Sequence, residues 1–217
     1  MFFATVISIL LSAPVSDVEL KDTLSHSIVE SSAKQALPVE RLASPVSVVY
    51  LDELEDRYID SPKKLSAIIP NLHIPDYGSA MTSSIYLRGF GSRMENPVLG
   101  LYVDDVPVLN KNAYDMDMLD IRRADMFRGP QGTLYGRNSM CGVLSLNTLS
   151  PSSYEGIRAG LEYGSANSVS ARASVYRKTD KGLAVGAGAG FRHSDGFYTN
   201  VYDGGKCDPL DAVSFRL

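Results

Sequence analysis

The chain has no tryptophan, only two cysteines and only three histidines among its 217 residues. Cys141 and Cys207 lie far apart and form no C-x-x-C or zinc-ligand spacing, so a disulfide between them and two free thiols both stay open. His26, His73 and His193 are scattered, and no H-E-x-x-H, G-x-S-x-G or P-loop motif occurs. The sequence therefore indicates no enzyme, metal or cofactor, and no set of residues supports the alternative of a hydrolase or oxidoreductase.

Clusters of positive charge are also missing. The formal net charge is −4, the pI is about 5.4, and Lys and Arg form no extended run. A general nucleic-acid binder needs a basic stripe that displaces counterions from phosphate, so no nucleic acid is expected as a partner. Gly186–Gly190 is glycine-rich, but it lies within an alternating strand pattern and lacks the strand-turn-helix setting of a dinucleotide loop.

The apolar run at the N-terminus is short. Phe2–Leu11 has ten residues, too few to span a bilayer as a helix and about the length of a signal-peptide core. Residues 1–16 are therefore predicted to be a signal peptide, with small residues near the cleavage site at Ser12, Ala13 and Ser16. No Lys or Arg precedes the run, so a buried N-terminal strand or helix is the alternative.

One stretch, Ile121–Thr148, is unlike an ordinary globular sequence. In its middle a proline lacks an N–H and fixes φ, while three glycines permit positive φ; these loop-shaping residues are Gly129, Pro130, Gly132 and Gly136. Arg128–Asn138 is therefore expected to form a tight, specifically folded loop that continues neither as helix nor as strand. Strand-like runs flank it at Ala124–Phe127 and Val143–Thr148. A plain surface loop is the alternative.

The residues before this loop alternate between strand-like and helix-like segments. Pro45–Leu51 is predicted to be a strand. Ser61–Pro70 has a serine N-cap, a proline in the first turn and apolar residues at i, i+3 and i+4, which predicts a helix that packs on a sheet. Ser84–Phe90 and Val98–Val108 are further predicted strands, the second bent by a turn at Asp104–Asp105.

Four separated motifs resemble, in the right order, the plug domain of TonB-dependent outer-membrane receptors. They are a helix end, an LRGFG strand, a YVDDVP hairpin and the RGPQGTLYGRN loop, at Leu65–Pro70, Leu87–Gly91, Tyr102–Pro107 and Arg128–Asn138. The resemblance covers residues 39–150 and implies an α+β plug domain, a small mixed sheet with short helices, over residues 43–150. The chain departs from the family at Arg122, where an acid is common, and at Asp105 and Cys141, where glycine is usual.

After Pro151 the sequence changes to strict alternation of apolar and small or polar residues. Three such segments occur, Ile157–Tyr163, Val169–Val175 and Leu183–Phe191. Each repeat spans about ten residues, the length of a tilted strand that crosses an outer membrane. The resemblance implies that residues 151–217 are the first three or so strands of an antiparallel transmembrane β-barrel. Because a plugged transporter barrel has about 22 strands, we expect this chain to be a truncated product or a fragment.

The arginines of the motifs suggest a role. In the family, plug arginines pair with carboxylates on the barrel wall, and a pull from TonB is thought to loosen them. The resemblance implies this latch role for Arg88, Arg128 and Arg137, together with Asp125. A guanidinium group stays charged and can hold a carboxylate through two hydrogen bonds, which suits a pair that must be broken and remade. Ordinary surface arginines are the alternative.

The remaining expectations concern partners and location. Residues 17–42 are polar and aperiodic, as in a flexible linker, and a short extended segment lies where the family has its TonB box: Ser27, Ile28, Val29, Glu30 and Ser31. The resemblance implies TonB, outer-membrane lipid and a large or scarce nutrient of unknown identity as partners, with a surface lipoprotein as a further candidate. The outer membrane is the expected location. The alternative is an isolated periplasmic plug that acts as an interaction or signalling module.

Overall fold

The computed structural model describes residues 7–14, 42, 44–75, 84–92, 96–179 and 182–217. The chain divides into two compact units, Lys21–Thr148 and a second one of Met1–Leu20 with Leu149–Leu217. The TonB-box candidate Ser27–Ser31 lies outside the described residues, as does most of the predicted linker. Within the described ranges, no helix is long and apolar enough to cross a membrane.

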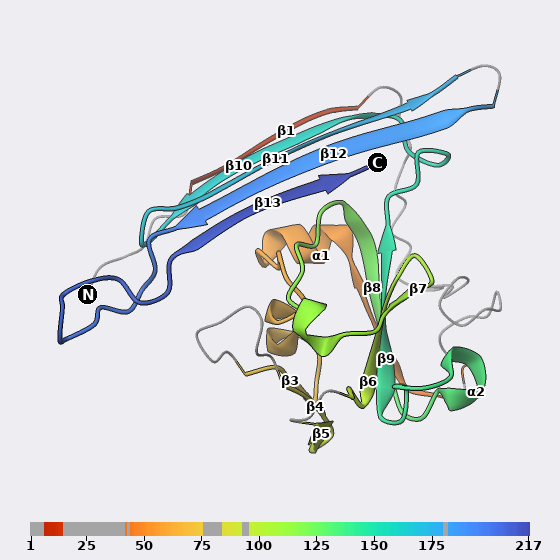
Figure 1. The fold of residues 1–217 in the computed structure, drawn as a ribbon. Coiled ribbons are helices and arrows are strands. Elements are labelled where there is room, and N and C mark those ends of the chain that lie inside the picture. The colour runs from red at the N-terminus through yellow and green to blue at the C-terminus, as the bar shows by residue number, and fades with distance from the viewer. Residues whose placement is uncertain (1–6, 15–41, 43, 76–83, 93–95, 180–181) are drawn as a thin grey trace. The chain divides into compact units, whose positions relative to one another are not determined.

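A five-stranded sheet forms the centre of the unit Lys21–Thr148, which we call the plug unit (Figure 1). Its strands lie in the order β2 (Val46–Tyr50), β8 (Ile121–Arg128), β9 (Gly142–Thr148), β6 (Leu99–Val103) and β7 (Val106–Val108). β6 and β9 run parallel and the other neighbours antiparallel. The predicted small mixed sheet is confirmed, as are the strands that flank the glycine-and-proline loop.

The other elements of the plug unit are short. A second sheet contains β3 (Leu72–His73), β4 (Ile85–Leu87) and β5 (Phe90–Ser92). Two α-helical and two 3-10 segments are described: α1 (Leu51–Asp56), η2 (Lys64–Ala67), η3 (Lys111–Ala113) and α2 (Gly132–Tyr135). The core lies between these elements and both sheets, and its fully buried members include Leu65, Leu87, Leu101, Met126 and Leu144.

The predicted helix at Ser61–Pro70 is only a 3-10 turn, η2. Its N-cap is Lys63 and no side chain caps it, so the prediction of Ser61 as N-cap is wrong. Pro70 ends the segment, because it lacks the N–H that a longer helix would need there. The apolar spacing was informative nonetheless, since Leu65 and Ile69 are both buried in the core.

Ser84–Phe90 is a hairpin and not the single strand that its sequence predicts. Arg88 and Gly89 have φ of 53° and 82° and form the turn between the antiparallel strands β4 and β5. Two consecutive residues with positive φ give a hairpin turn whose twist matches the strands. In Val98–Val108 the expected turn is present: Asp104 and Asp105, with φ of 47° and 66°, connect β6 to β7.

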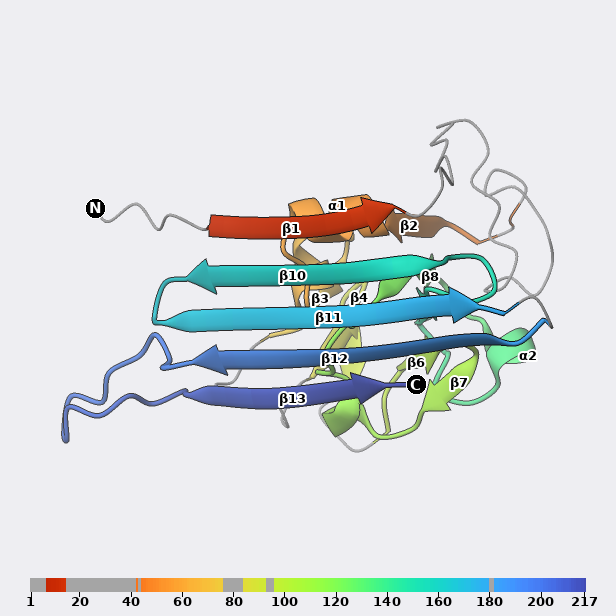
Figure 2. The same ribbon diagram turned by 90° about the horizontal axis from the view of Figure 1, so that it is seen from above.

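The second unit is one antiparallel sheet, which we call the meander (Figure 2). Its strands lie in the order β1 (Ile7–Pro14), β10 (Gly156–Gly164), β11 (Ser168–Lys178), β12 (Ala184–Ser194) and β13 (Leu210–Arg216). The three predicted strands are confirmed and β13 was missed. β1 lies in the stretch predicted to be a signal peptide, where a strand was the alternative, and the signal peptide stays a prediction.

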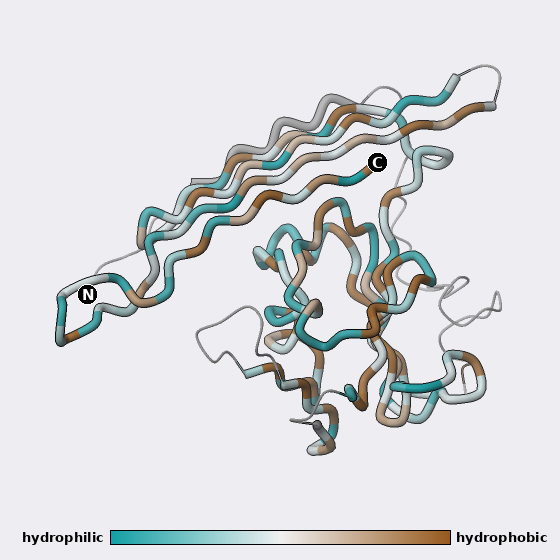
Figure 3. Tube along the Cα trace, in the orientation of Figure 1, coloured by the Kyte–Doolittle hydropathy of each residue, from teal (hydrophilic) through white to brown (hydrophobic). Residues whose placement is uncertain are grey.

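Opposite faces of the meander differ in chemistry. Large apolar residues on one face are between 44% and 78% exposed, including Ile157, Leu161, Phe191, Val213 and Phe215. The other face has glycine, serine and arginine at positions such as Gly160, Arg172, Ser174, Gly188 and Arg192. Figure 3 shows the resulting alternation of hydropathy along β10 to β13. Within the described part of the chain, nothing covers the apolar face.

Candidate plug loop and latch residues

The loop between β8 and β9 is closed by its own backbone. Gln131 N donates a hydrogen bond to Ser139 O at 2.9 Å, and Gly136 N donates to Gly132 O at 3.0 Å. The second bond closes the single helical turn α2, so the expectation that the loop contains no helix is wrong. Pro130 precedes this turn and does not interrupt it, and Gly136, with φ of 72°, ends it.

The three glycines of the loop are not equivalent. Gly136 (φ 72°) and Gly129 (φ 156°) adopt conformations that other residues rarely adopt. A Cβ at Gly129 would also approach Ser44 Oγ to 3.2 Å. Gly132 has no positive φ, and a Cβ there would meet open space. The shape of the loop therefore depends on Gly129 and Gly136, while Gly132 is replaceable.

A buried tyrosine anchors the loop to the sheet. The ring of Tyr135 lies edge-on to that of Tyr102 at a centroid distance of 4.6 Å, and 6.4 Å from that of Phe127. The Tyr102 hydroxyl donates to Tyr135 O at 2.6 Å. Burial, and then the negative charges of Asp105 and Asp125, raise the pKa of Tyr135, so its hydroxyl stays neutral. Sequence reasoning missed this anchor, although both tyrosines lie within the quoted motifs.

Asp125 has partners inside the plug unit. Its carboxylate is fully buried, Arg123 Nε lies 3.0 Å from both of its oxygens, and Asn147 Nδ2 donates to it at 3.1 Å. Arg123 precedes it on β8, and Asn147 lies on the neighbouring strand β9. The carboxylate thus ties β8 to β9 below the loop. This geometry gives Asp125 partners within the plug unit, and its part in the plug–barrel latch stays a prediction.

The three latch arginines are available for a partner. Arg88 and Arg137 are exposed, and Arg128 is half-buried, with its Nε buried and without a hydrogen-bond partner. No described carboxylate forms an ion pair with any of them. The β4–β5 hairpin lies beside the loop, because Leu87 packs against Gly142 so closely that a Cβ there would come within 2.6 Å of its Cδ2. Arg88 lies in the turn between β4 and β5, and Arg128 and Arg137 lie before and after α2; Figure 1 shows β5 and α2 at the same end of the plug sheet.

The plug unit is a mixed sheet whose glycine-and-proline loop has arginines without an ion-pair partner among the described residues. The meander that follows it in the sequence has an uncovered apolar face. Together these features are typical of a receptor plug domain followed by strands of a β-barrel wall. Residues 38–143 match the family model described as "TonB-dependent Receptor Plug Domain". This stretch of the chain is therefore a TonB-dependent receptor plug domain.

Its relatives are receptors and transporters much longer than this chain. The pesticin receptor of Yersinia pestis is 38% identical over 109 residues, 49% of this chain and 16% of the relative. A vitamin B12 transporter of Vibrio vulnificus is 26% identical over 195 residues, 86% of this chain and 31% of the relative. The ferric yersiniabactin uptake receptor FyuA from Yersinia pestis has a similar structure, with 29% identity, a TM-score of 0.65, and coverage of 79% of this chain and 27% of that one. The chain spans about a sixth of the pesticin receptor.

Proposed function

We propose that this chain supplies the plug and the first wall strands of an outer-membrane transporter, which imports a large or scarce nutrient with energy from TonB. The folded loop that presents unpaired guanidinium groups is the observation that carries the proposal. The names of relatives support a metal chelate or a corrinoid as the substrate class, since they include a ferric yersiniabactin uptake receptor, a vitamin B12 transporter and a ferrichrome outer membrane transporter.

In this transporter Arg88, Arg128 and Arg137 act as the latch. A free guanidinium group can accept a carboxylate in a bidentate pair without giving up an existing ion pair. Arg128 is the strongest latch candidate of the three. It is half-buried and its Nε has no hydrogen-bond partner, and a carboxylate partner would offset the resulting desolvation cost. Asp125 holds the strands below the loop.

The apolar face of the meander meets the lipid of the outer membrane. Burial of apolar surface contributes about 25 cal/mol per Å², so a row of half-exposed Leu, Val and Phe side chains disfavours water on that face. Strands of nine to eleven residues in β10 to β12 have the length that an outer-membrane crossing needs. The face with glycine, serine and arginine then lines the interior.

Uptake by a transporter that contains this chain tests the latch. Arg128→Ala should leave substrate binding to cells largely intact and change TonB-dependent uptake of the labelled ferric siderophore or cobalamin that the cells accept. Arg57→Ala is the matched control, because Arg57 is an exposed arginine that already pairs with Glu53 at 3.2 Å. Equal uptake in both variants and in the unmodified protein would exclude the latch.

Location and partner need a second experiment. In cell fractions, heat-modifiable migration in the outer membrane supports the transporter, whereas a soluble periplasmic protein supports an isolated plug module. A cysteine at Val29, with Cys141 and Cys207 replaced by alanine, should form a cross-link to a cysteine-bearing TonB if Ser27–Ser31 is the TonB box. If that cross-link is absent and a cysteine at another position in residues 17–42 forms one, the TonB box lies at that other position.

A further inference from the structure

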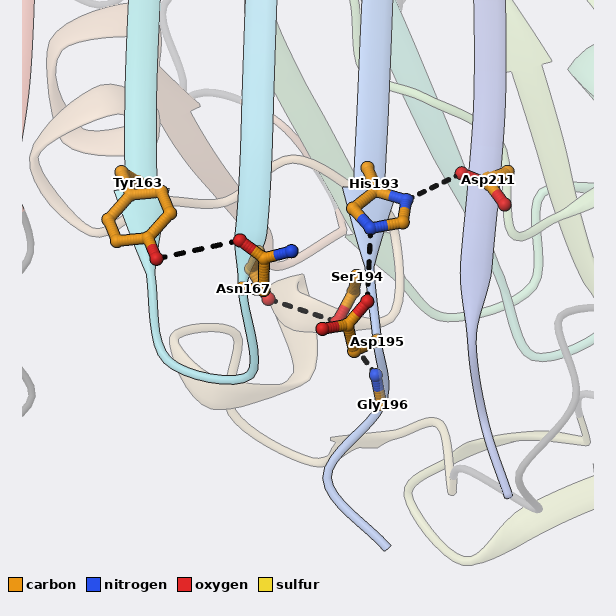
Figure 4. A network of polar contacts seen from close by, with 8 residues as sticks. Tyr163, Asn167, His193, Ser194, Asp195, Gly196 and Asp211 are labelled. Carbon is orange, nitrogen blue, oxygen red and sulfur yellow. Dashed lines mark hydrogen bonds and ion pairs between the residues drawn. The ribbon is translucent and has the colours of Figure 1, made fainter. Parts of the chain in front are cut away.

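A polar row closes the apolar face of the meander at one end. The last fully apolar row across the strands contains Leu161, Ala171, Phe191 and Val213. The next row of register partners contains Tyr163, Val169, His193 and Asp211. The Tyr163 hydroxyl contacts Asn167 Oδ1 at 3.5 Å (Figure 4). His193 therefore lies beyond the apolar band, at the rim of the sheet.

The ring of His193 lies between two carboxylates. Its Nδ1 is 2.7 Å from Asp211 Oδ1 and its Nε2 is 3.2 Å from Asp195 Oδ1 (Figure 4). Both carboxylates can only accept hydrogen bonds, and a neutral imidazole has a single N–H. Both bonds can therefore form together only when the ring is the doubly protonated imidazolium. The observed geometry belongs to that protonation state.

The electrostatic surroundings favour the same state. Asp211 on β13 and Asp195 after β12 are the charged groups that face the ring, while its register partner on β11 is the apolar Val169. The hydrogen bond to Asp211 is the main reason why the pKa of His193 is raised above its ordinary value. Stability from this contact is fully present below the ordinary pKa of histidine and is lost as the pH rises through the raised value.

The two carboxylates stand at the two ends of a loop. Asp195 begins residues 195–209, and Asp211 follows them on β13. The loop has its own internal bonds: Asn200 N donates to Gly205 O at 2.8 Å, and Cys207 N donates to Tyr198 O at 3.1 Å. It is a small ordered hairpin, and backbone contacts also hold its base: Asp195 N donates to Ala166 O at 3.0 Å, and Ser194 pairs with Leu210 in the β12–β13 ladder.

We propose that His193 is a proton-operated clasp, which tightens the base of the loop 195–209 beyond what its backbone hydrogen bonds do and loosens that base when the imidazolium loses its proton. The clasp controls the position of a hairpin whose tip residues Val201 and Tyr202 are fully exposed. At slightly acidic pH the tip is fixed relative to the sheet rim. At alkaline pH only one of the two carboxylates is bonded, and the second carboxylate faces a ring nitrogen lone pair. This device does not depend on the transport proposal.

A nitroxide spin label on Cys207 tests the clasp, with Cys141 replaced by alanine and the full chain in detergent micelles. The mobile fraction of the label should rise several-fold between about pH 5.5 and about pH 8.5, with a midpoint above the ordinary histidine value. Asp203→Asn is the matched control, because Asp203 Oδ1 only caps Gly205 N at the tip and a carboxamide keeps that acceptor. This control should leave the midpoint unchanged.

Asp211→Asn separates the clasp from simple packing. A carboxamide can donate to a neutral imidazole, while the ring N–H donates to Asp195, so the base should stay closed at both pH values. Label mobility that does not depend on pH in the unmodified chain would overturn the proposal, as would an Asp211→Asn variant that is loose at both pH values although circular dichroism shows a native sheet. If that variant fails to fold, His193→Lys provides the test. Its positive charge persists over this pH range, so the label on Cys207 should stay immobile at both pH values. A pH response that persists in His193→Lys would mean that another group causes the change in mobility, which would overturn the proposal.

Discussion

The plug sheet and the meander use the same alternation of apolar and polar residues for opposite purposes. In the plug unit the apolar positions Leu101, Met126 and Leu144 are fully buried against other elements of the same unit. In the meander the corresponding positions, such as Leu161 and Phe215, are more than half exposed. Alternation therefore identifies which residues share a face of a sheet. It does not say whether the protein or its surroundings cover that face.

Charges follow the same division. The plug unit has an ion pair inside its sheet, between Arg123 and the fully buried Asp125. The meander has an arginine–glutamate pair, Arg172 and Glu162, on the polar face, where both side chains keep some exposure to water. The plug unit thus has its own apolar core and a buried carboxylate that is paired within the unit. The meander depends on an apolar environment that the described residues do not supply.

Loss of the buried carboxylate should have the largest effect. Asp125→Ala leaves the Arg123 guanidinium and the Asn147 amide without their acceptor inside the sheet, and breaking a buried pair costs about 3–5 kcal/mol. The free energy of unfolding of the plug unit, followed by circular dichroism in denaturant because tryptophan is absent, measures this loss. A decrease below about 1 kcal/mol would show that water reaches this site.

A matched pair of leucine truncations tests the two sheets directly. Leu146→Ala on β9 removes a fully buried side chain, so the free energy of unfolding should fall by about 2–5 kcal/mol. Leu161→Ala on β10 removes a side chain that is 51% exposed and should change it by less than about 1 kcal/mol in water. Equal losses in denaturant titrations would mean that the meander has a closed core of its own.

Alkaline pH should destabilise the plug unit through Tyr114. Its hydroxyl donates to Leu99 O at 2.8 Å, accepts from Leu101 N at 3.2 Å, and burial raises its pKa to about 12. The unfolded chain releases this proton near pH 10, so the free energy of unfolding should fall between about pH 10 and about pH 12 by roughly 2–3 kcal/mol. Tyr114→Phe should be less stable at neutral pH and show a shallower alkaline decrease. An unchanged alkaline slope would assign the effect to other groups.

Two glycines of the loop allow a smaller and cleaner comparison. Gly136→Ala forces a Cβ into a backbone with φ of 72°, which should cost about 1–2 kcal/mol of unfolding free energy. Gly132→Ala adds the same methyl group at an ordinary helical position with open space, so it should be neutral or slightly stabilising. If both variants unfold at the same denaturant concentration, the loop does not need its left-handed residue.

Sequence motifs predicted the mixed sheet and the loop because glycine, proline and alternation act locally. They failed at two places in the plug unit: η2 replaced the capped helix between Pro62 and Pro70, and the turn at Arg88 split a predicted strand into a hairpin. β13 escaped notice because Asp211 shares the face of Val213 and Phe215, which shortens the apolar pattern. The burial of Asp125 depends on Asn147, a partner 22 positions away, and no local pattern reveals such a contact.

The Arg172–Glu162 pair of the meander should show the smallest effect and completes the comparison. Arg172 Nη2 lies 2.7 Å from Glu162 Oε1, and the two side chains are 28% and 18% exposed. Because water still reaches both groups, a double-mutant cycle with Arg172→Ala and Glu162→Ala should give a coupling energy of about 0.2–1 kcal/mol, which shrinks in high salt. The same cycle on Arg123 and Asp125 should give a larger value with little salt dependence, since that carboxylate is fully buried. If the Arg172–Glu162 pair instead couples as strongly as the Arg123–Asp125 pair, the polar face of the meander is closed off from water. The two sheets would then differ in the exposure of their apolar faces alone.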